Sequence, residues 1–126
     1  VTNMQSMFYD CSSLTTLDVS NFDTSSVTTM SYMFRSCDSL ATLNLSTFDT
    51  SSVINMYQMF IECLSLTSLD LSSFDTSSVT DMGYMFYGCA NLVTVDVSGF
   101  DTPSVITMNQ MFRNCTNFWK GNIKFL

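Results

Sequence analysis

Histidine is absent from this chain of 126 residues. Its absence removes the side chain that most often serves as a general base or a metal ligand in proteins. Basic residues are also scarce, since four Lys and Arg stand against eleven Asp and Glu, and the formal net charge is −7. This charge repels nucleic-acid phosphates and anionic lipid headgroups, so we expect neither as a partner.

Long apolar runs are missing as well. No stretch approaches the roughly 18 apolar residues that a membrane-spanning helix needs, and the first residues lack the basic-then-apolar order of a signal peptide. We therefore expect no membrane insertion. The chain also lacks an initiator methionine and opens inside a repeated unit, so we interpret it as a segment of a longer protein.

What the chain does contain is a repeat of 26 residues. Each copy can be written V-T-x-M-x-x-M-F-x-x-C-x-x-L-x-x-L-D-L-S-x-F-D-T-S-S, and four full copies precede a partial one. All ten Met and all five Cys fall into columns of this repeat. Because one unit is too small to bury its own apolar face, neighbouring copies must stack and share a core.

The apolar spacing predicts one helix and one strand in each copy. In the second copy, apolar residues recur at steps of three and four, as on one face of a helix: Val27, Met30, Met33, Phe34 and Cys37. Leu43 and Leu45 then alternate with polar Asn44, as a half-buried strand requires. The predicted fold class is α/β, a leucine-rich-repeat solenoid with one short parallel strand and one short helix in each 26-residue repeat.

The Met-Phe pair and the Cys of every copy are predicted to form the structural core. Cys is among the most often buried residue types, and a shared solenoid core needs apolar side chains at every layer. Metal, redox or hydrophobic-ligand roles for these columns are the weaker alternatives, because a spacing of 26 residues matches no zinc or redox motif. The predicted core residues are Met7, Phe8, Cys11, Met33, Phe34, Cys37, Met59, Phe60, Cys63, Met85, Phe86, Cys89, Met111, Phe112 and Cys115.

The columns L-x-x-L-x-L, M-F-x-x-C-x-x-L and F-D-T-S resemble the leucine-rich repeats of BspA-like bacterial surface proteins, most closely the 26-residue surface-protein repeats of mycoplasmas, Listeria and lactic acid bacteria. The resemblance runs from Val1 to about Phe118. It implies a solenoid on an extracellular or cell-surface protein, associated with adhesion and protein binding. An asparagine ladder is usual in such repeats, but this chain has phenylalanines there, so we expect stacked rings instead: Phe22, Phe48, Phe74 and Phe100.

Residues 1–126 are expected to form a single solenoid of four to five repeats. Residues 1–11 would be a partial N-terminal helix, and residues 118–126 depart from the repeat. Two interpretations of this end stay open, a strand-like cap over the last layer or the start of a following segment, and both involve Trp119, Ile123, Phe125 and Leu126.

A carboxylate stands in the loop of each of the first four copies, at Asp23, Asp49, Asp75 and Asp101. Stacked carboxylates repel one another unless each accepts N–H hydrogen bonds or binds a cation. We favour a turn or helix cap, and a calcium role is the alternative, weakened by the lack of alternating acidic ligands.

The outward positions of the strands form the candidate binding face, because they are small, polar and mildly acidic. Such a face can bind a basic or sugar-like partner at little cost in side-chain entropy, although a plain solvated face is the competing interpretation. Its residues are Thr16, Asp18, Thr42, Asn44, Ser68, Asp70, Thr94 and Asp96. A second candidate is the predicted helix side, where residue types vary between copies: Tyr9, Arg35, Ile61, Tyr87 and Arg113, with Tyr32, Gln58, Tyr84 and Gln110.

These features favour a non-enzymatic binding or adhesion module that recognises a protein or a glycan. The sequence contains no nucleophile motif and no phosphate-binding loop, and we expect no catalytic residue, cofactor or metal. The alternative is a structural spacer or self-assembling segment whose ends stack, because Met4, Met7 and Phe8 of the first copy have no preceding layer to cover them.

Overall fold

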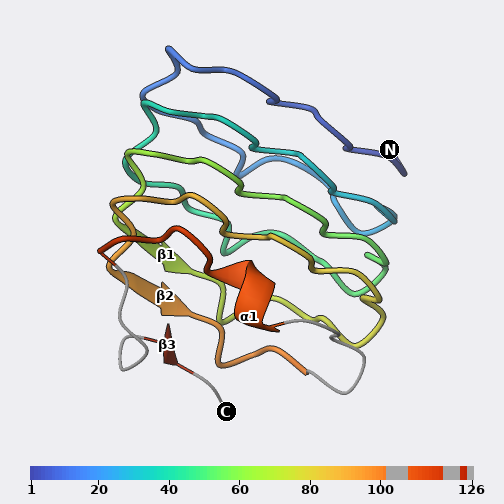
Figure 1. The fold of residues 1–126 in the computed structure, drawn as a ribbon. Helices are drawn as coiled ribbons and strands as arrows, with labels where there is room; N and C mark the ends of the chain where they lie inside the picture. The colour runs from blue at the N-terminus through green and yellow to red at the C-terminus, as the bar shows by residue number, and fades with distance from the viewer. Residues whose placement is uncertain (102–107, 118–122, 125–126) are drawn as a thin grey trace.

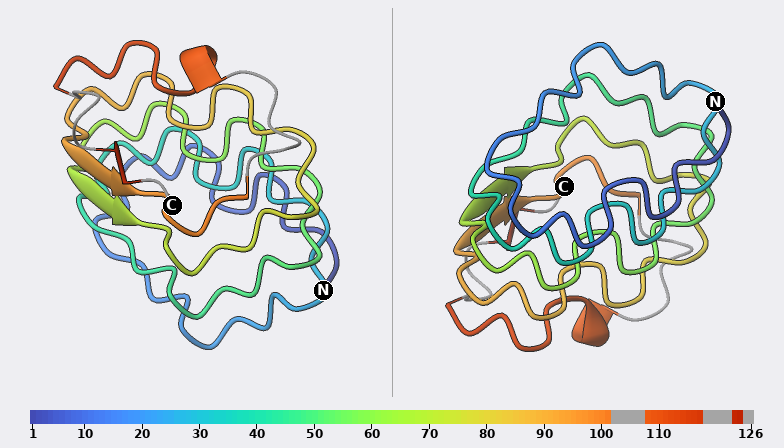
Figure 2. Two further views of the ribbon diagram at one scale, coloured as in Figure 1. Left: turned by 90° about the horizontal axis from the view of Figure 1, so that it is seen from below. Right: turned by 90° about the horizontal axis from the view of Figure 1, so that it is seen from above.

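A computed structural model of the chain describes residues 1–101, 108–117 and 123–124. Within these residues the backbone winds into coils, one for each sequence copy, and the coils lie one on another (Figure 1). Backbone hydrogen bonds join residues 25 or 26 positions apart, as from Tyr32 N–H to the Tyr57 carbonyl and from Ile54 N–H to the Thr28 carbonyl. Seen from below and from above, successive coils appear as flattened loops, each displaced from the one before it (Figure 2).

The strand segments pair in parallel along one side of the stack. Strand β1 spans Ser68–Asp70, β2 spans Thr94–Asp96 and β3 spans Ile123–Lys124, in the order β1-β2-β3. Ser68 lies opposite Thr94, and Val95 lies opposite Ile123. β1 and β2 occupy the predicted column, whereas residues 16–18 and 42–44 of the first two copies form no strand. β3 lies outside that column, because the equivalent position in the last copy is Gly121 and Val95 pairs with Ile123 instead. β3 extends the sheet past β2, while Trp119, Phe125 and Leu126 lie outside the described residues.

The opposite side differs from the predicted helices. Residues 31–36 and 57–62, like 5–10 in the first copy, form consecutive turns, and the described helix α1 spans only Met108–Met111. The Met33 N–H donates to the Met30 carbonyl, and the Cys37 N–H donates to the Phe34 carbonyl, each three residues back. Residues in the left-handed region, such as Tyr32 (φ 58°) and Ser36 (φ 58°), interrupt any helix. Successive turns return a side chain to the core every three or four residues, which reproduces helical spacing.

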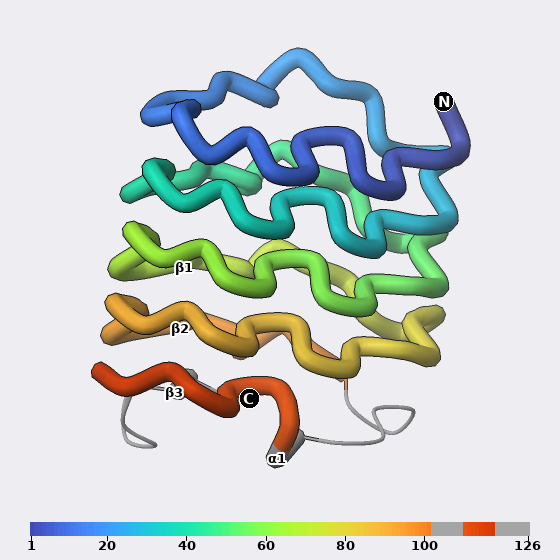
Figure 3. Tube along the Cα trace, turned by 45° about the horizontal axis from the view of Figure 1, so that its top comes forward, coloured from blue at the N-terminus to red at the C-terminus, as the bar shows by residue number. Residues whose placement is uncertain are grey.

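The amide groups that a helix would use internally bind the next coil instead. The N–H groups of Tyr32, Phe34 and Ser36 donate to the carbonyl oxygens of Tyr57, Met59 and Ile61. Figure 3 shows these turn segments in front, one above another, with the strand segments behind them. We call the exposed surface of the turn segments the turn face and that of the strand segments the strand face. No helix in the described part of the chain could span a bilayer.

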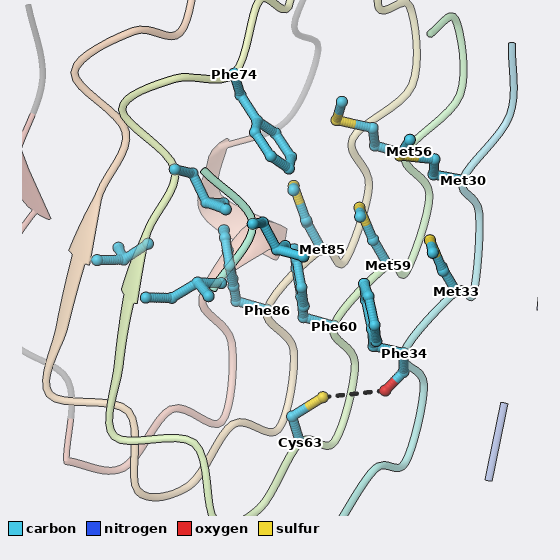
Figure 4. Close-up of a cluster of buried hydrophobic side chains, with 14 of the residues drawn as sticks. Met30, Met33, Phe34, Met56, Met59, Phe60, Cys63, Phe74, Met85 and Phe86 are labelled. Atoms are coloured by element: carbon cyan, nitrogen blue, oxygen red, sulfur yellow. Dashed lines mark hydrogen bonds between the residues drawn. The ribbon is translucent and has the colours of Figure 1, made fainter. Parts of the chain in front are cut away.

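The core lies between these two sides and repeats at every layer (Figure 4). Phe34, Phe60 and Phe86 are fully buried, and their rings stack at centroid distances of 5.5 Å with interplanar angles of 3° and 2°. The stack continues to Phe8 at 5.6 Å and to Phe112 at 5.2 Å. The predicted core residues of the middle copies are thus buried together.

The first coil differs from the middle ones because it has a neighbouring coil on one side only in this structure. Phe8 and Cys11 are partly buried against the core, while Met7, expected inside, is 49% exposed. In the last described coil, Met111 and Cys115 are buried and Phe112 is partly buried. The second phenylalanine column is less regular, since Phe74 stacks on Phe100 at 6.5 Å but Phe22 stacks on Phe8 at 6.2 Å.

Candidate binding surface

The eight predicted strand-face residues lie on one surface. Asp96 is partly buried, and the other seven are exposed. The residue between each pair packs against the core, fully for Leu69 (3% exposed) and Val95 (1% exposed) and partly for Leu17 and Leu43. This alternation follows from the extended backbone, in which successive side chains point to opposite sides.

The Asp or Asn at the end of each strand segment caps the turn that follows it. Its Oδ1 accepts a hydrogen bond from the backbone N–H two residues later: Ser20 to Asp18 (3.0 Å), Ser46 to Asn44 (3.0 Å), Ser72 to Asp70 (2.9 Å) and Ser98 to Asp96 (3.0 Å). The Ser20 hydroxyl also donates to Asp18, and these two bonds hold the pKa of the Asp18 carboxyl below its usual value. The Asp18 carboxylate is therefore held in position and charged at neutral pH.

A groove of about 470 Å³ opens on this face between the second and third coils. Four predicted residues line it, namely Thr42, Asn44, Ser68 and Asp70, together with Leu43, Ser46, Ser72 and Ser73. A smaller depression of about 130 Å³ lies beside it and includes Asp18 and Asn44. Seven of the eight groove residues carry a hydroxyl, amide or carboxylate, and Leu43 supplies an apolar patch.

The carboxylates of the D-T-S-S loops cap a second corner of the coil. Asp49 Oδ1 accepts the Ser51 hydroxyl at 2.6 Å and the Ser51 N–H at 3.0 Å, and Asp23 accepts the same two bonds from Ser25. These bonds lower the pKa of both carboxyls, even though neighbouring carboxylates oppose the shift at Asp49. Among the described residues, no three potential metal-ligating side chains come together.

Sequence reasoning missed the role of the threonine in the same loops. Thr24, Thr50 and Thr76 are buried, and each hydroxyl donates to a backbone carbonyl of the next coil and accepts that residue's N–H. The signal was present, because a threonine occupies the same place in each of the first four copies. We call this arrangement the threonine ladder.

The cysteine column likewise joins neighbouring coils. The thiols of Cys37, Cys63, Cys89 and Cys115 donate to the carbonyl oxygens of Phe8, Phe34, Phe60 and Phe86 at 3.2, 3.1, 3.0 and 2.9 Å. All five cysteines are free thiols. Burial raises the pKa of Cys37 to about 11 and that of Cys115 to about 12, so these thiols are neutral at physiological pH.

The turn face carries the second candidate set except Ile61, which is buried at 6% exposure, contrary to the prediction that this column lies outside the core. Tyr32, Tyr57 and Tyr84 meet edge to face at centroid distances of 5.5 and 6.0 Å, and Tyr84 meets Tyr87 at 5.8 Å. All these tyrosines are partly exposed. The structure thus brings together side chains from the two variable columns and Tyr57 from a third column of the repeat.

Comparison with known proteins places the chain in a family without assigning it an activity. No curated protein and no solved structure matches it. Residues 2–125 match the family described as "Mycoplasma protein of unknown function, DUF285". This repeat protein belongs to that family.

Proposed function

We propose that the chain is a non-enzymatic binding module, a solenoid of the BspA-like leucine-rich-repeat type, on a bacterial cell-surface or secreted protein. Its strand face binds a protein or glycan ligand. The main support for this proposal is the groove of about 470 Å³. Four of its eight lining residues are ones that the sequence predicts to point outward from the strand segments. The extracellular location rests on the sequence resemblance.

The chemistry of the groove suits a hydroxylated or basic ligand. Its volume lies within the range of about 300–1,000 Å³ that is usual for ligand sites. Hydroxyl groups of Thr42, Ser46 and Ser68 can donate and accept hydrogen bonds, whereas the Asp70 carboxylate only accepts. Short side chains such as these lose little rotamer entropy when a ligand orders them.

The test fills the groove without disturbing the Asx turns beside it. Ser68→Trp places a large ring in the groove, and Ser78→Trp, at an exposed position outside the groove lining, is the matched control. In a screen against extracellular proteins and glycans, the S68W variant should lose the partner that the wild type binds, and the S78W variant should keep it. Undiminished binding by S68W would place the binding site elsewhere.

End-to-end self-association is a second candidate function. It is favoured by the apolar side chains of the first coil, where Leu14 and Leu17 are only partly buried and Met7 is 49% exposed. Exposed apolar side chains at the end of a repeat stack are available for such a contact. Light scattering at increasing protein concentration tests it, since growth of the mass in single-chain steps is expected and a constant monomer mass would rule it out.

A further inference from the structure

The turn face collects residue types that are rare elsewhere in the chain. All five tyrosines and both arginines of the sequence belong to the turn segments. This surface lies opposite the strand face (Figure 3), so a ligand bound here would not touch the groove. Tyrosine and arginine are the types enriched where binding energy concentrates.

Arg35 is held in place by its neighbours on three coils. Its guanidinium carbon lies 5.4 Å from the ring centroid of Tyr9 in the first coil and 5.9 Å from that of Tyr32 in its own coil. Its Nη1 donates to Oε1 of Gln58 in the third coil at 3.1 Å. The side chain is partly exposed, and its orientation is set before any ligand arrives.

The charge of Arg35 is not neutralised within the described part of the chain, where it forms no ion pair. This is unexpected in a protein with eleven acidic residues and four basic ones. A guanidinium carries five N–H donors in a fork that matches a carboxylate, and only one bond to Gln58 is made. The remaining donors are available to an anionic group.

Tyr32 has a φ of 58° and Tyr84 has a φ of 57°, in the left-handed region. Ser6 and Gln58, at the equivalent positions of their copies, adopt the same conformation. The turn geometry of the repeat therefore sets where the Tyr32 ring and the Gln58 side chain leave the backbone.

We propose that Arg35, Tyr9, Tyr32 and Gln58 form a binding site for the carboxylate of an acidic sugar within a glycan. The Arg35 fork binds the carboxylate, the two flanking rings contact the C–H faces of the sugar, and the Gln58 amide binds a hydroxyl. The site is separate from the strand-face groove and does not depend on the function proposed for it.

Charge favours a glycan over an acidic protein segment as the occupant. The chain carries a net charge of −7, and Asp10 and Glu62 belong to the turn segments of the coils on either side of Arg35. A segment with a carboxylate on many residues would be repelled by this field. A single carboxylate among neutral sugars avoids the repulsion, and the nearby carboxylates can accept hydrogen bonds from its hydroxyls.

The experiment titrates the labelled chain with trisaccharides that end in one glucuronic, galacturonic or sialic acid and follows chemical shifts by NMR. At least one probe should shift the Arg35 Nε–H signal and the ring signals of Tyr9 and Tyr32. The same trisaccharide with its carboxyl group reduced to an alcohol is the ligand control and should bind at least about tenfold more weakly. Poly-glutamate tests the acidic-peptide alternative.

Variants separate this site from general charge effects. Arg35→Gln should weaken binding of the shifted probe about tenfold or more, and Arg35→Lys should not restore it, because a lysine cannot form the planar fork. Arg113→Gln removes the same charge from the same repeat column and should leave binding unchanged, as should the groove variant S68W. Melting curves confirm that each variant is folded. The proposal is overturned if no probe shifts these signals, if the reduced probe or poly-glutamate binds as well, or if R113Q weakens binding as much as R35Q.

Discussion

The Thr50 hydroxyl donates to the Asp75 carbonyl at 2.9 Å and accepts the Asp75 N–H at 2.8 Å. One buried side chain thus satisfies both backbone groups of a residue 25 positions away. Thr24 and Thr76 make the same pair of bonds to Asp49 and Asp101. The threonine ladder therefore joins four coils. At this corner, side-chain hydroxyls, rather than backbone groups of the neighbouring coil, make the hydrogen bonds between coils.

Replacing Thr50 by Val keeps the shape of the side chain and removes its hydroxyl. The Asp75 N–H and carbonyl then lose their hydrogen-bond partner at a buried position, since Thr50 is 1% exposed. An unsatisfied buried polar group costs about 1–3 kcal/mol, so T50V should lower the unfolding free energy by about that amount or more. Thr50→Ser keeps the hydroxyl and should cost about 0.8 kcal/mol for the lost methyl group. Urea unfolding measures both, and equal losses in the two variants would contradict the ladder.

Phe60 lies in the middle of the continuous phenylalanine stack. It is fully buried, with Phe34 and Phe86 each at 5.5 Å. Phe60→Ala should destabilise the chain by about 3–5 kcal/mol, because a large cavity opens between coils. Phe112→Ala, at a partly buried position, should cost less. If thermal unfolding shows the same loss for both, the stack does not form a shared core.

The cysteines should differ in reactivity toward a thiol reagent. The sequence predicts all five in the core, but Cys11 is only partly buried while Cys37, Cys63, Cys89 and Cys115 are buried. Burial raises the pKa of Cys37 to about 11, which leaves little of the reactive thiolate near neutral pH. Mass spectrometry after brief alkylation should find the label on Cys11 first. Rapid labelling of Cys63 in the folded chain would contradict the structure.

The loop carboxylates should make stability depend on pH in acid. Hydrogen bonds from Ser25, Ser51 and Ser77, first from the hydroxyl and then from the N–H, lower the pKa of Asp23, Asp49 and Asp75 below 3.8. A carboxyl whose pKa is lower in the folded state stabilises the fold above its unfolded pKa. That stabilisation is lost as the pH falls through the folded value.

The melting temperature should therefore fall as the pH drops below about 4. Ser51→Ala removes the hydroxyl bond to Asp49 and should make this fall shallower, although relief of the net charge of −7 acts in the opposite direction in every variant. Ser78→Ala serves as the control at an exposed serine of the neighbouring column. Identical pH profiles for S51A and the wild type would show that the hydrogen-bonded Asp49 carboxylate does not contribute to the pH dependence.

The sequence predicts the layers better than it predicts local structure. Strict columns placed Phe34, Phe60 and Phe86 in one core, because a residue repeated at every layer must contact its own copies in a stack. The outward strand positions, and hence half of the groove lining, follow from simple alternation. Neither inference needs the exact backbone conformation.

The turn segments could not be predicted in the same way. Helical spacing at Met30, Met33 and Cys37 is also produced by successive turns, and the choice depends on whether N–H groups bind within a coil or across to the next one. That choice is made by stacking, since Tyr32 and Ser36 adopt left-handed conformations which single-residue preferences disfavour. The cluster of Arg35 with Tyr9, Tyr32 and Gln58 could not be predicted from the sequence either, because it combines residues from three coils.

The central claim is that equivalent residues of consecutive copies lie one above another in a continuous stack. Nuclear Overhauser contacts between the ring protons of Phe34 and Phe60, and of Phe60 and Phe86, test it most directly. The structure predicts strong contacts for both pairs, since their centroids lie 5.5 Å apart across 26 residues of sequence. Contacts confined to residues within four positions of each ring, as in independent short helices, would contradict it.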